Sequence, residues 1–345
     1  MAIVDLQAWS SSVDADEEAV FNRQPLWSAG NDALFYASDG PFGDGAWAPE
    51  REYEWLRCDG GWGLSTIYVA MWVNSTSAVT GDRTILLLGE GTVASPTYHV
   101  DIQWTGHGFV LRRGKAGTVL ARIEGPFLRF DTWHHVACKV VVHDSTGVVI
   151  IEVDGEEVVN ETGLDTRNGG TSGIIDLIEM ASHYQYQIRY AEPIVWSSAG
   201  DSPTDFFGLH RVHMIKPDGD TSTGFTTLGA GTNAAEVDEQ ACDDDTSYNY
   251  SATATNKDKL TTESVPTAVN SVYAVQAKCQ AKDDAGTDNI KVGLDSGTES
   301  LSANQALANG AYNLFEGPLE TVDPNTSSQW TETNVNATDV VYEHG

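Results

Sequence analysis

The sequence predicts an all-β protein built from β-sandwiches. Short stretches in which apolar and polar residues alternate recur along the chain, separated by clusters of Gly, Asp, Asn and Ser. Helical periodicity is nearly absent, and 345 residues are enough for about two domains. Many short strands at this spacing are typical of a sandwich or a jelly roll.

The expected strands of the first half follow one another from residue 67 onward. They span residues 67–73, 84–88, 98–104, 109–113, 118–123, 135–142, 147–154 and 156–159. Gly114–Gly117 predicts a hairpin turn, and Asp154-Gly155 predicts a second, tighter one, because glycine tolerates positive φ. Residues 1–50 show no clear pattern.

The second half differs in composition. Residues 209–215 indicate one more strand, and residues 216–222 have the composition of a linker. Beyond them Thr, Asn, Ala and Asp dominate, with strands expected at residues 271–278 and 289–294. We therefore expect a first domain over residues 1–215 and a smaller β-sandwich over residues 216–345.

The charge balance excludes two classes of partner. Lys and Arg number 19 against 50 Asp and Glu, a formal net charge of −31. Nucleic acid and anionic membrane surfaces repel such a polyanion. No apolar stretch approaches the ~20 residues of a membrane helix. The first residues, from Met1 to Asp5, lack the basic and apolar segments of a signal peptide. Synthesis in the cytoplasm, without membrane insertion, is expected.

The four cysteines are not spaced as zinc ligands. None of Cys58, Cys138, Cys242 and Cys279 belongs to a C-x-x-C pair. Cys138 and Cys279 alternate with polar residues in expected strands, which is typical of buried thiols. A Cys242–Cys279 bridge is the alternative within the second domain.

One pair of segments resembles a known family. Residues 130–137 read FDTWHHVA and residues 149–156 read VIIEVDGE. They resemble the W-H-H-V-A … V-x-V-D-G pattern of concanavalin-like, laminin-G-type jelly rolls, over residues 50–196 and more loosely over 1–215. The resemblance implies a jelly-roll fold, and we expect Trp133 between the sheets, near Val149 and Ile151. It indicates the fold and leaves the function open.

A second resemblance spans the junction between the expected domains. Residues 205–212 (DFFGLHRV), 217–220 (PDGD), 237–239 (VDE) and 243–248 (DDDTSY) follow in this order. They resemble a module of tailed-bacteriophage structural proteins, in which it often follows a laminin-G-type domain. The resemblance implies a minor tail, fibre or other virion protein.

The acidic and histidine motifs point away from catalysis. Glu152, Asp154 and Glu156 nearly match the E-x-D-x-E array of glycoside hydrolases with a related fold. The turn at Asp154 would remove Glu156 from the shared face of the strand. His134 and His135 are neighbours on a strand and point to opposite faces, so they cannot chelate one ion together. No nucleophile elbow, phosphate loop or dinucleotide fingerprint is present. The sequence predicts no enzyme, no catalytic residue and no cofactor.

Two groups are candidate ligand residues. Calcium prefers clustered carboxylate oxygens, which Asp243, Asp244 and Asp245 offer, although such a cluster is often a solvated turn. Aromatic rings near expected loops can stack on sugars, or else pack in a core or an interface. These candidates are Trp62, Trp104, Tyr184 and Tyr186.

The leading functional hypothesis is a non-enzymatic structural protein of a bacteriophage virion. It would be an accessory tail, collar, fibre or capsid-decoration component that binds other virion proteins and further copies of itself, as a trimer rather than a dimer. The alternative is a carbohydrate-binding or adhesion module that recognises cell-surface glycans. A divergent glycoside hydrolase or lyase is the third reading, disfavoured by the missing catalytic array.

Overall fold

The fold is nearly all β, as predicted. The computed structural model describes residues 3–6, 27–29, 33–36, 40–41, 46–49, 55–92, 95–169, 172–181, 188–197, 205–238, 245–265, 269–284 and 287–345. The chain divides into two compact units, unit 1 (Met1–Val212) and unit 2 (His213–Gly345). Each is described by itself below.

Sheet A of unit 1 is antiparallel. Its described strands in spatial order are β13 (Glu156–Leu164), β12 (Gly147–Val153), β11 (His134–Val141), β6 (Thr66–Ser75), β15 (Ile188–Trp196), β4 (Ala46–Pro49) and β3 (Ala33–Tyr36), and β1 (Ile3–Leu6) pairs with β15. The turn expected at Asp154-Gly155 is confirmed, because both residues have positive φ, of 53° and 86°. Val153 and Glu156 lie opposite each other across it.

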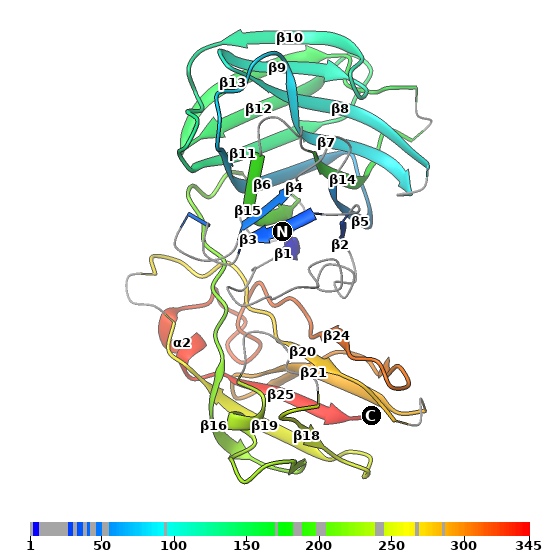
Figure 1. The fold of residues 1–345 in the computed structure, drawn as a ribbon, viewed down its shortest axis with the longest axis vertical. Coiled ribbons are helices and arrows are strands. Elements are labelled where there is room, and N and C mark those ends of the chain that lie inside the picture. The colour runs from blue at the N-terminus through cyan, green and yellow to red at the C-terminus, as the bar shows by residue number, and fades with distance from the viewer. Residues whose placement is uncertain are drawn as a thin grey trace. The chain divides into compact units, whose positions relative to one another are not determined.

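Sheet B of unit 1 is also antiparallel. Its described strands in spatial order are β10 (Thr118–Glu124), β9 (Gly108–Arg113), β8 (Ser95–Thr105), β7 (Arg83–Thr92), β14 (Ile175–Ala181), β5 (Trp55–Leu64) and β2 (Trp27–Ala29). Figure 1 shows β7, β8, β9 and β10 following one another along the sheet. The expected turn at Gly114–Gly117 is confirmed by a 3.0 Å bond from the Gly117 N–H to the Gly114 carbonyl.

The core of unit 1 joins inward residues of both sheets. Val136 and Cys138 from sheet A belong to the same buried cluster as Val100, Ile102 and Trp104 from sheet B. Along β12 buried and half-buried residues alternate without exception, as the period of a strand requires. Burying each large apolar side chain contributes roughly 1.5–3 kcal/mol, so this cluster is the main source of stability.

The expected position of Trp133 is wrong. Trp133 is half-buried and lies in the bend before β11, outside the core cluster, whereas Trp104 is 3% exposed inside it. The inward positions of β11 are those of Val136 and Cys138, and Trp133 precedes the strand, so the alternation does not direct its ring inward.

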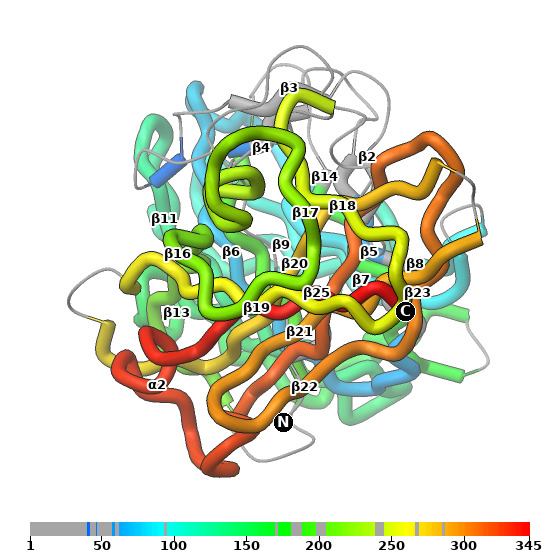
Figure 2. The backbone as a smooth tube through the Cα atoms, turned by 90° about the horizontal axis from the view of Figure 1, so that it is seen from below, coloured from blue at the N-terminus to red at the C-terminus, as the bar shows by residue number. Residues whose placement is uncertain are grey.

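Unit 2 is built on a second antiparallel sheet. Its described strands are β16 (Pro217–Ser222), β19 (Lys257–Thr262), β25 (Asp339–His344), β21 (Asn289–Asp295) and β22 (Glu299–Leu301) in spatial order, with β23 (Gln305–Ala306) also on β21. Figure 2 shows β19, β25, β21 and β22 side by side. Smaller elements are the pairs β17 (Thr226–Thr227) with β18 (Asn249–Tyr250) and β20 (Lys278–Ala281) with β24 (Asn313–Glu316), the 3-10 helix η1 (Ala234–Glu236) and helix α2 (Glu332–Asn336). Leu260, Val292, Phe315, Trp330 and Tyr342 lie in its core.

Three expectations for the second half need correction. The expected linker forms the edge strand β16, whose polar composition suits an exposed edge. Residues 209–215 form no strand, and residues 271–277 contain only an isolated bridge at Val275 before β20 begins at Lys278. The strand expected at 289–294 is confirmed as β21. At 209–215 and 271–277 the apolar residues pack as irregular chain, which alternation alone does not distinguish from a strand.

Two further observations concern thiols and membranes. Cys138 is buried as expected, Cys279 has a free thiol, and Cys242 lies outside the described residues. Among the helices that the structure describes, none has the length and apolarity to cross a membrane.

Candidate functional site

The face of sheet B that points away from the core carries buried polar side chains. On β8 the residues Val100, Ile102 and Trp104 point into the core, so Asp101 and Gln103 point to the opposite face. Asp101 is 0% exposed, although it faces away from the core. A carboxylate buried on the outer face of a sheet needs partners there, because burying an unpaired charge is costly.

The strand register aligns these groups into one row. Asp101 lies opposite Leu87 on β7 and opposite Arg112 on β9. Leu87 in turn lies opposite Glu179 on β14, which lies opposite Arg57 on β5. Neighbouring strands are about 4.8 Å apart, so the row crosses five strands and extends over roughly 19 Å.

One half of the row is centred on the Glu179 carboxylate, which is 1% exposed. Its Oε2 accepts hydrogen bonds from Arg57 Nε at 2.6 Å and from the Tyr98 hydroxyl. Its Oε1 accepts a bond from Lys115 Nζ at 3.0 Å. The Lys115 ammonium also lies 5.3 Å from the centre of the Tyr98 ring. Two cations and a phenol therefore hold one buried carboxylate.

The other half is centred on Asp101. It accepts hydrogen bonds from Thr84 Oγ1 at 2.9 Å and Gln103 Nε2 at 2.8 Å. Gln103 Oε1 accepts a 2.7 Å bond from Arg112 Nε, and Arg112 Nη2 donates to Asp82 at 2.8 Å. Arg122 extends the chain of contacts, donating to both oxygens of Asp82. We call Arg57, Asp82, Tyr98, Asp101, Gln103, Arg112, Lys115, Arg122 and Glu179 the polar row.

The electrostatics of the row follow from burial and pairing. Burial raises the pKa of the Asp101 carboxyl, against the hydrogen bonds that lower it. Burial and the neighbouring Glu179 raise the pKa of Tyr98, so its hydroxyl stays protonated as a donor at neutral pH. At the exposed end the hydrogen bond from Arg122 lowers the pKa of Asp82. The row thus pairs each of its carboxylates with hydrogen-bond donors.

The hairpin between β9 and β10 covers the centre of the row. The backbone N–H of Ala116, at φ 51°, donates to Asp101 at 2.9 Å, and Arg112 Nη1 donates to the Gly117 carbonyl at 3.0 Å. The side chains of Lys115 and Arg122 remain 50% and 45% exposed. A ligand on this face would meet those two cations first, while Glu179 holds Lys115 and Asp82 holds Arg122.

The two aromatic candidates that the structure describes pack against the core of unit 1. Trp104 is part of the core, and Trp62 is half-buried and packs against the same cluster. Tyr184 and Tyr186 lie outside the described residues. Trp104 was assigned to a loop end, but its period-two spacing from Val100 and Ile102 directs it inward.

The acidic and histidine motifs lie apart from the row. Asp243 and Asp244 fall outside the described residues, and Asp245 is bonded to Lys282 and Tyr312. Among the residues that the structure does describe, no group of three potential ligands is placed to hold a metal ion.

Glu152 ends a strand before the turn and Glu156 is exposed beyond it, as predicted. His134 binds Asp154 at 2.7 Å, while His135 contacts a different residue, His210. The two rings therefore have different partners, although the His135 backbone N–H also donates to Asp154 at 2.9 Å.

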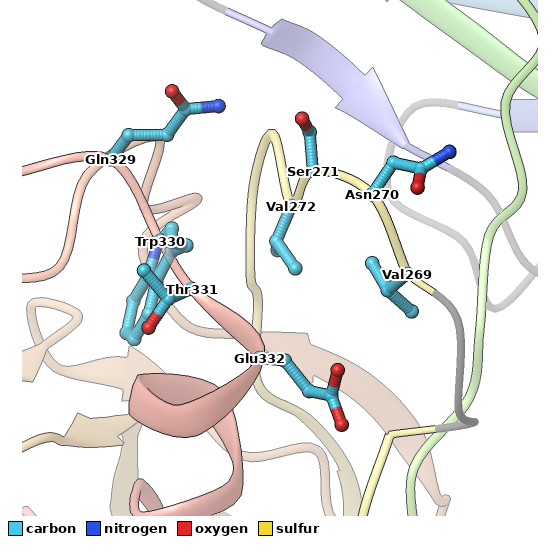
Figure 3. Close-up of a pocket in the computed structure, with 8 residues that line it drawn as sticks. All are labelled: Val269, Asn270, Ser271, Val272, Gln329, Trp330, Thr331 and Glu332. Atoms are coloured by element: carbon cyan, nitrogen blue, oxygen red, sulfur yellow. The ribbon is translucent and has the colours of Figure 1, made fainter.

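A hollow of about 280 Å³ lies in unit 2 between residues 269–272 and 329–332. Figure 3 shows the two segments facing each other with Trp330 at one side. The Trp330 indole donates to the Glu320 carbonyl at 2.8 Å, and its ring is part of the core. No charged group is buried in the hollow among the residues described, so the polar row is the better candidate site.

The sequence contained part of the signal for the polar row. Polar Asp101 and Gln103 alternate with apolar residues in a strand that was recognised. Their partners Arg112 and Asp82, and the pair Tyr98–Glu179, come from other strands, and only the register brings them together.

Comparisons with known proteins describe the fold and leave the family open. No protein-family model matches the chain, and no curated protein matches it. Among solved structures, the chain is similar to the cellulose-induced protein Cip1, with 10% identity, a TM-score of 0.39, and coverage of 54% of this chain and 95% of that one.

Two further similar structures are viral. A carbohydrate esterase from the Shiga toxin-encoding bacteriophage phi24B has 13% identity and a TM-score of 0.35, covering 55% of this chain and 98% of its own. The alginate lyase vAL-1 from Chlorella virus has 11% identity and a TM-score of 0.39, covering 56% and 99%. Likeness at this level concerns β-rich folds.

The sequence-based prediction that the chain is not an enzyme is contradicted by these neighbours, because two of them are enzymes. We withdraw that prediction. Catalytic motifs such as the one formed by Glu152 and Glu156 consist of residues close together in sequence. The structure gathers its buried polar groups from strands far apart, which motif spacing cannot reveal.

Proposed function

We propose that unit 1 is a carbohydrate-binding module whose ligand lies on the polar row. The observation behind this proposal is a network of paired donors and acceptors on one sheet face, which includes Arg57 with Glu179, and Asp101 with Gln103 and Arg112. Sugar hydroxyls donate and accept at once, so they need guanidinium and carboxylate groups side by side.

The charge of the face also supports a sugar ligand. The row pairs its cations with carboxylates, so it forms an almost neutral strip on a protein with a net charge of −31. A neutral strip imposes no long-range repulsion on a polysaccharide. Lys115 and Arg122, the most exposed members, are the first contacts.

Binding is tested with the full chain on a glycan array, followed by titration of the best ligand into Lys115→Ala and Arg122→Ala proteins. Each substitution should weaken binding about tenfold, the effect of losing one charge-assisted hydrogen bond of about 1.5 kcal/mol. Arg129→Ala is the matched control, because Arg129 is an exposed cation outside the row. Unchanged affinity in both row variants would refute the site.

The same ligands serve to test for turnover. Incubation of each bound polysaccharide or ester with the protein, with measurement of new sugar ends or released acid, distinguishes a binding module from an enzyme. Tyr98→Phe should abolish any turnover that depends on proton transfer at this face, because Tyr98 and Glu179 are its closest proton-exchanging pair.

A virion location is the second candidate, and the ordered resemblance of residues 205–248 to tailed-phage structural proteins is the observation that favours it. Such a protein would bind a host-surface glycan while attached to other virion proteins, as a trimer. Antibody labelling of purified particles and light scattering of the isolated chain test this proposal. Unlabelled particles together with a monomer would contradict it.

A further inference from the structure

The outer face of sheet A is covered by residues 205–212, here called the strap. Phe206 lies edge-on against Tyr68, with ring centres 5.6 Å apart, and Phe207 packs on Trp196 at 4.5 Å. Tyr68 and Trp196 stack on each other at 5.2 Å. Both are 1% exposed, so the strap removes an aromatic surface of sheet A from water.

Polar contacts fasten the strap at its other end. His210 contributes three of them: its Nδ1 lies 2.7 Å from His135 Nε2, its Nε2 lies 2.7 Å from the Glu192 carbonyl, and its own carbonyl accepts a 3.1 Å bond from Trp72 Nε1. The Val212 N–H donates to Glu192 Oε2 at 2.8 Å, and Arg211 Nε lies 3.9 Å from Glu192 Oε1. The strap is therefore held by one histidine pair and one carboxylate.

The proton positions in the histidine pair follow from the acceptors. His210 Nε2 lies 2.7 Å from the Glu192 carbonyl, which only accepts, so this nitrogen bears the hydrogen. In the neutral ring His210 Nδ1 is then an acceptor, and His135 Nε2–H donates to it. His135 Nδ1 is buried and has no hydrogen-bond partner among the described residues. A first added proton can go to His135 Nδ1 and leaves the hydrogen bond between the rings intact, whereas a second would place hydrogens on both facing nitrogens.

We propose that the strap is an acid-released cover, which leaves sheet A when His135 and His210 are protonated and exposes Tyr68, Trp72 and Trp196. Both rings are buried, 7% and 1% exposed for His210 and His135, and their centres are 4.7 Å apart. Two imidazolium ions in that geometry repel each other without water between them. Release of the strap separates them and hydrates both.

The charged groups near the pair are engaged in other contacts. Asp154 accepts the His135 backbone N–H at 2.9 Å and binds the His134 ring at 2.7 Å. Glu192 is engaged by Val212 and Arg211, both on the strap itself. Lys139 lies over the Tyr68 ring at 5.2 Å and adds positive charge to the same face. Burial, and then repulsion by Asp205 at the start of the strap, raises the pKa of the Glu152 carboxyl.

The direction of the pH effect follows from the pKa values. Burial, and then the charge of His210, lowers the pKa of His135 to about 3, and burial lowers that of His210 to about 4, from 6.5. Depressed pKa values mean that the released strap binds protons more tightly than the closed one. The closed state is therefore fully stable above about pH 6.5 and loses stability as the pH falls toward 4.

Hydrogen exchange of the full chain measures the opening. The reporter is the Val212 amide, and residues 100–104 on β8 report global unfolding. After correction for intrinsic exchange, the opening constant at Val212 should rise up to about 100-fold from pH 6 to pH 5, tenfold for each proton taken up. The β8 amides should keep their protection. A flat response at Val212, or simultaneous loss at β8, would overturn the proposal.

Variants assign the protons. His135→Gln and His210→Gln should each halve the slope of the logarithm of the opening constant against pH, and the double variant should abolish it. His107→Gln, at an exposed histidine outside the strap, is the control that should keep the slope. A slope retained by the double variant would contradict the mechanism.

Imidazole NMR signals of the unmodified protein provide a measurement that needs no variant. Those of His135 and His210 should titrate only together with the release of the strap. Independent titration with the strap closed would refute the coupling.

Discussion

The hydroxyl of Tyr98 on β8 donates a hydrogen bond to Glu179 on β14, 81 residues further along the chain. The two strands are separated by β7 in the sheet, so the phenol reaches across that strand. The Tyr98 ring forms a small buried cluster with Leu87 and Leu177. Long-range polar contacts of this kind fix the arrangement of side chains on a face that would otherwise be free to vary.

Removing either partner should destabilise unit 1. Tyr98→Phe deletes a bond to a charged group, worth about 1.5–3 kcal/mol. Glu179→Gln leaves Arg57 and Lys115 without their carboxylate and should lower the free energy of unfolding by about 3 kcal/mol or more. Urea unfolding followed by circular dichroism measures both. Tyr250→Phe is the matched control, because Tyr250 is half exposed; an equal loss there would argue against the assignment.

The two tryptophans should differ sharply in their contribution to stability. Trp104→Ala opens a cavity in the core and should cost about 3–5 kcal/mol. Trp133→Ala, at a half-buried position outside the cluster, should cost clearly less. Thermal unfolding of the two variants measures the difference. A larger loss for Trp133 would restore its expected place between the sheets.

Alkaline pH should unfold the protein cooperatively. Burial is the first cause that raises the pKa of Tyr98, Tyr190 and Tyr342 above 10. A raised pKa in the folded state means that the unfolded state loses its protons first, so stability is full below about pH 10 and falls as the pH rises beyond it. Tyrosinate absorbance should therefore increase in step with the loss of circular dichroism. Complete ionisation of all tyrosines in a folded protein would contradict this prediction.

The Cys138 thiol should resist labelling. Burial raises its pKa to about 12, so the reactive thiolate is scarce at neutral pH. Iodoacetamide at about pH 8, followed by peptide mapping, should leave Cys138 unmodified in the native protein and label it fully in denaturant. Rapid native labelling would show that β11 opens locally.

Strand positions were predictable where the alternation of side chains was strong. β12 was recognised because Val149 and Ile151 are buried and their neighbours are not. The same rule failed at residues 209–215, where His210 and Val212 alternate with other residues but belong to the strap. Apolar periodicity shows that one side of a segment is buried. It does not show whether the segment is a hydrogen-bonded strand or an irregular segment held by side-chain contacts.

The candidate site was less accessible to sequence reasoning. Asp101 and Gln103 mark one strand, but Glu179 and Arg57 gain their meaning only from register across β5, β14, β7 and β8. The strap shows the same limit. Residues 205–212 were noticed for their resemblance to phage proteins, whereas their contacts with Tyr68, Trp196 and His135 depend on tertiary packing.

The last prediction is that the two units fold independently when cut between Val212 and His213. Each has a separate apolar cluster, one around Val100 and Val136 and the other around Val292 and Tyr342. The cut must follow Val212, because its N–H binds Glu192 and the strap covers Trp196. Fragments 1–212 and 213–345 should each melt cooperatively with a β-type circular dichroism spectrum.

A fragment ending at residue 204 lacks the strap and should melt at a lower temperature than 1–212, with its aromatic surface open to an apolar dye. A broad, non-cooperative transition in fragment 1–212 would contradict the division, and equal melting temperatures for the two N-terminal fragments would show that the strap contributes nothing to the stability of unit 1.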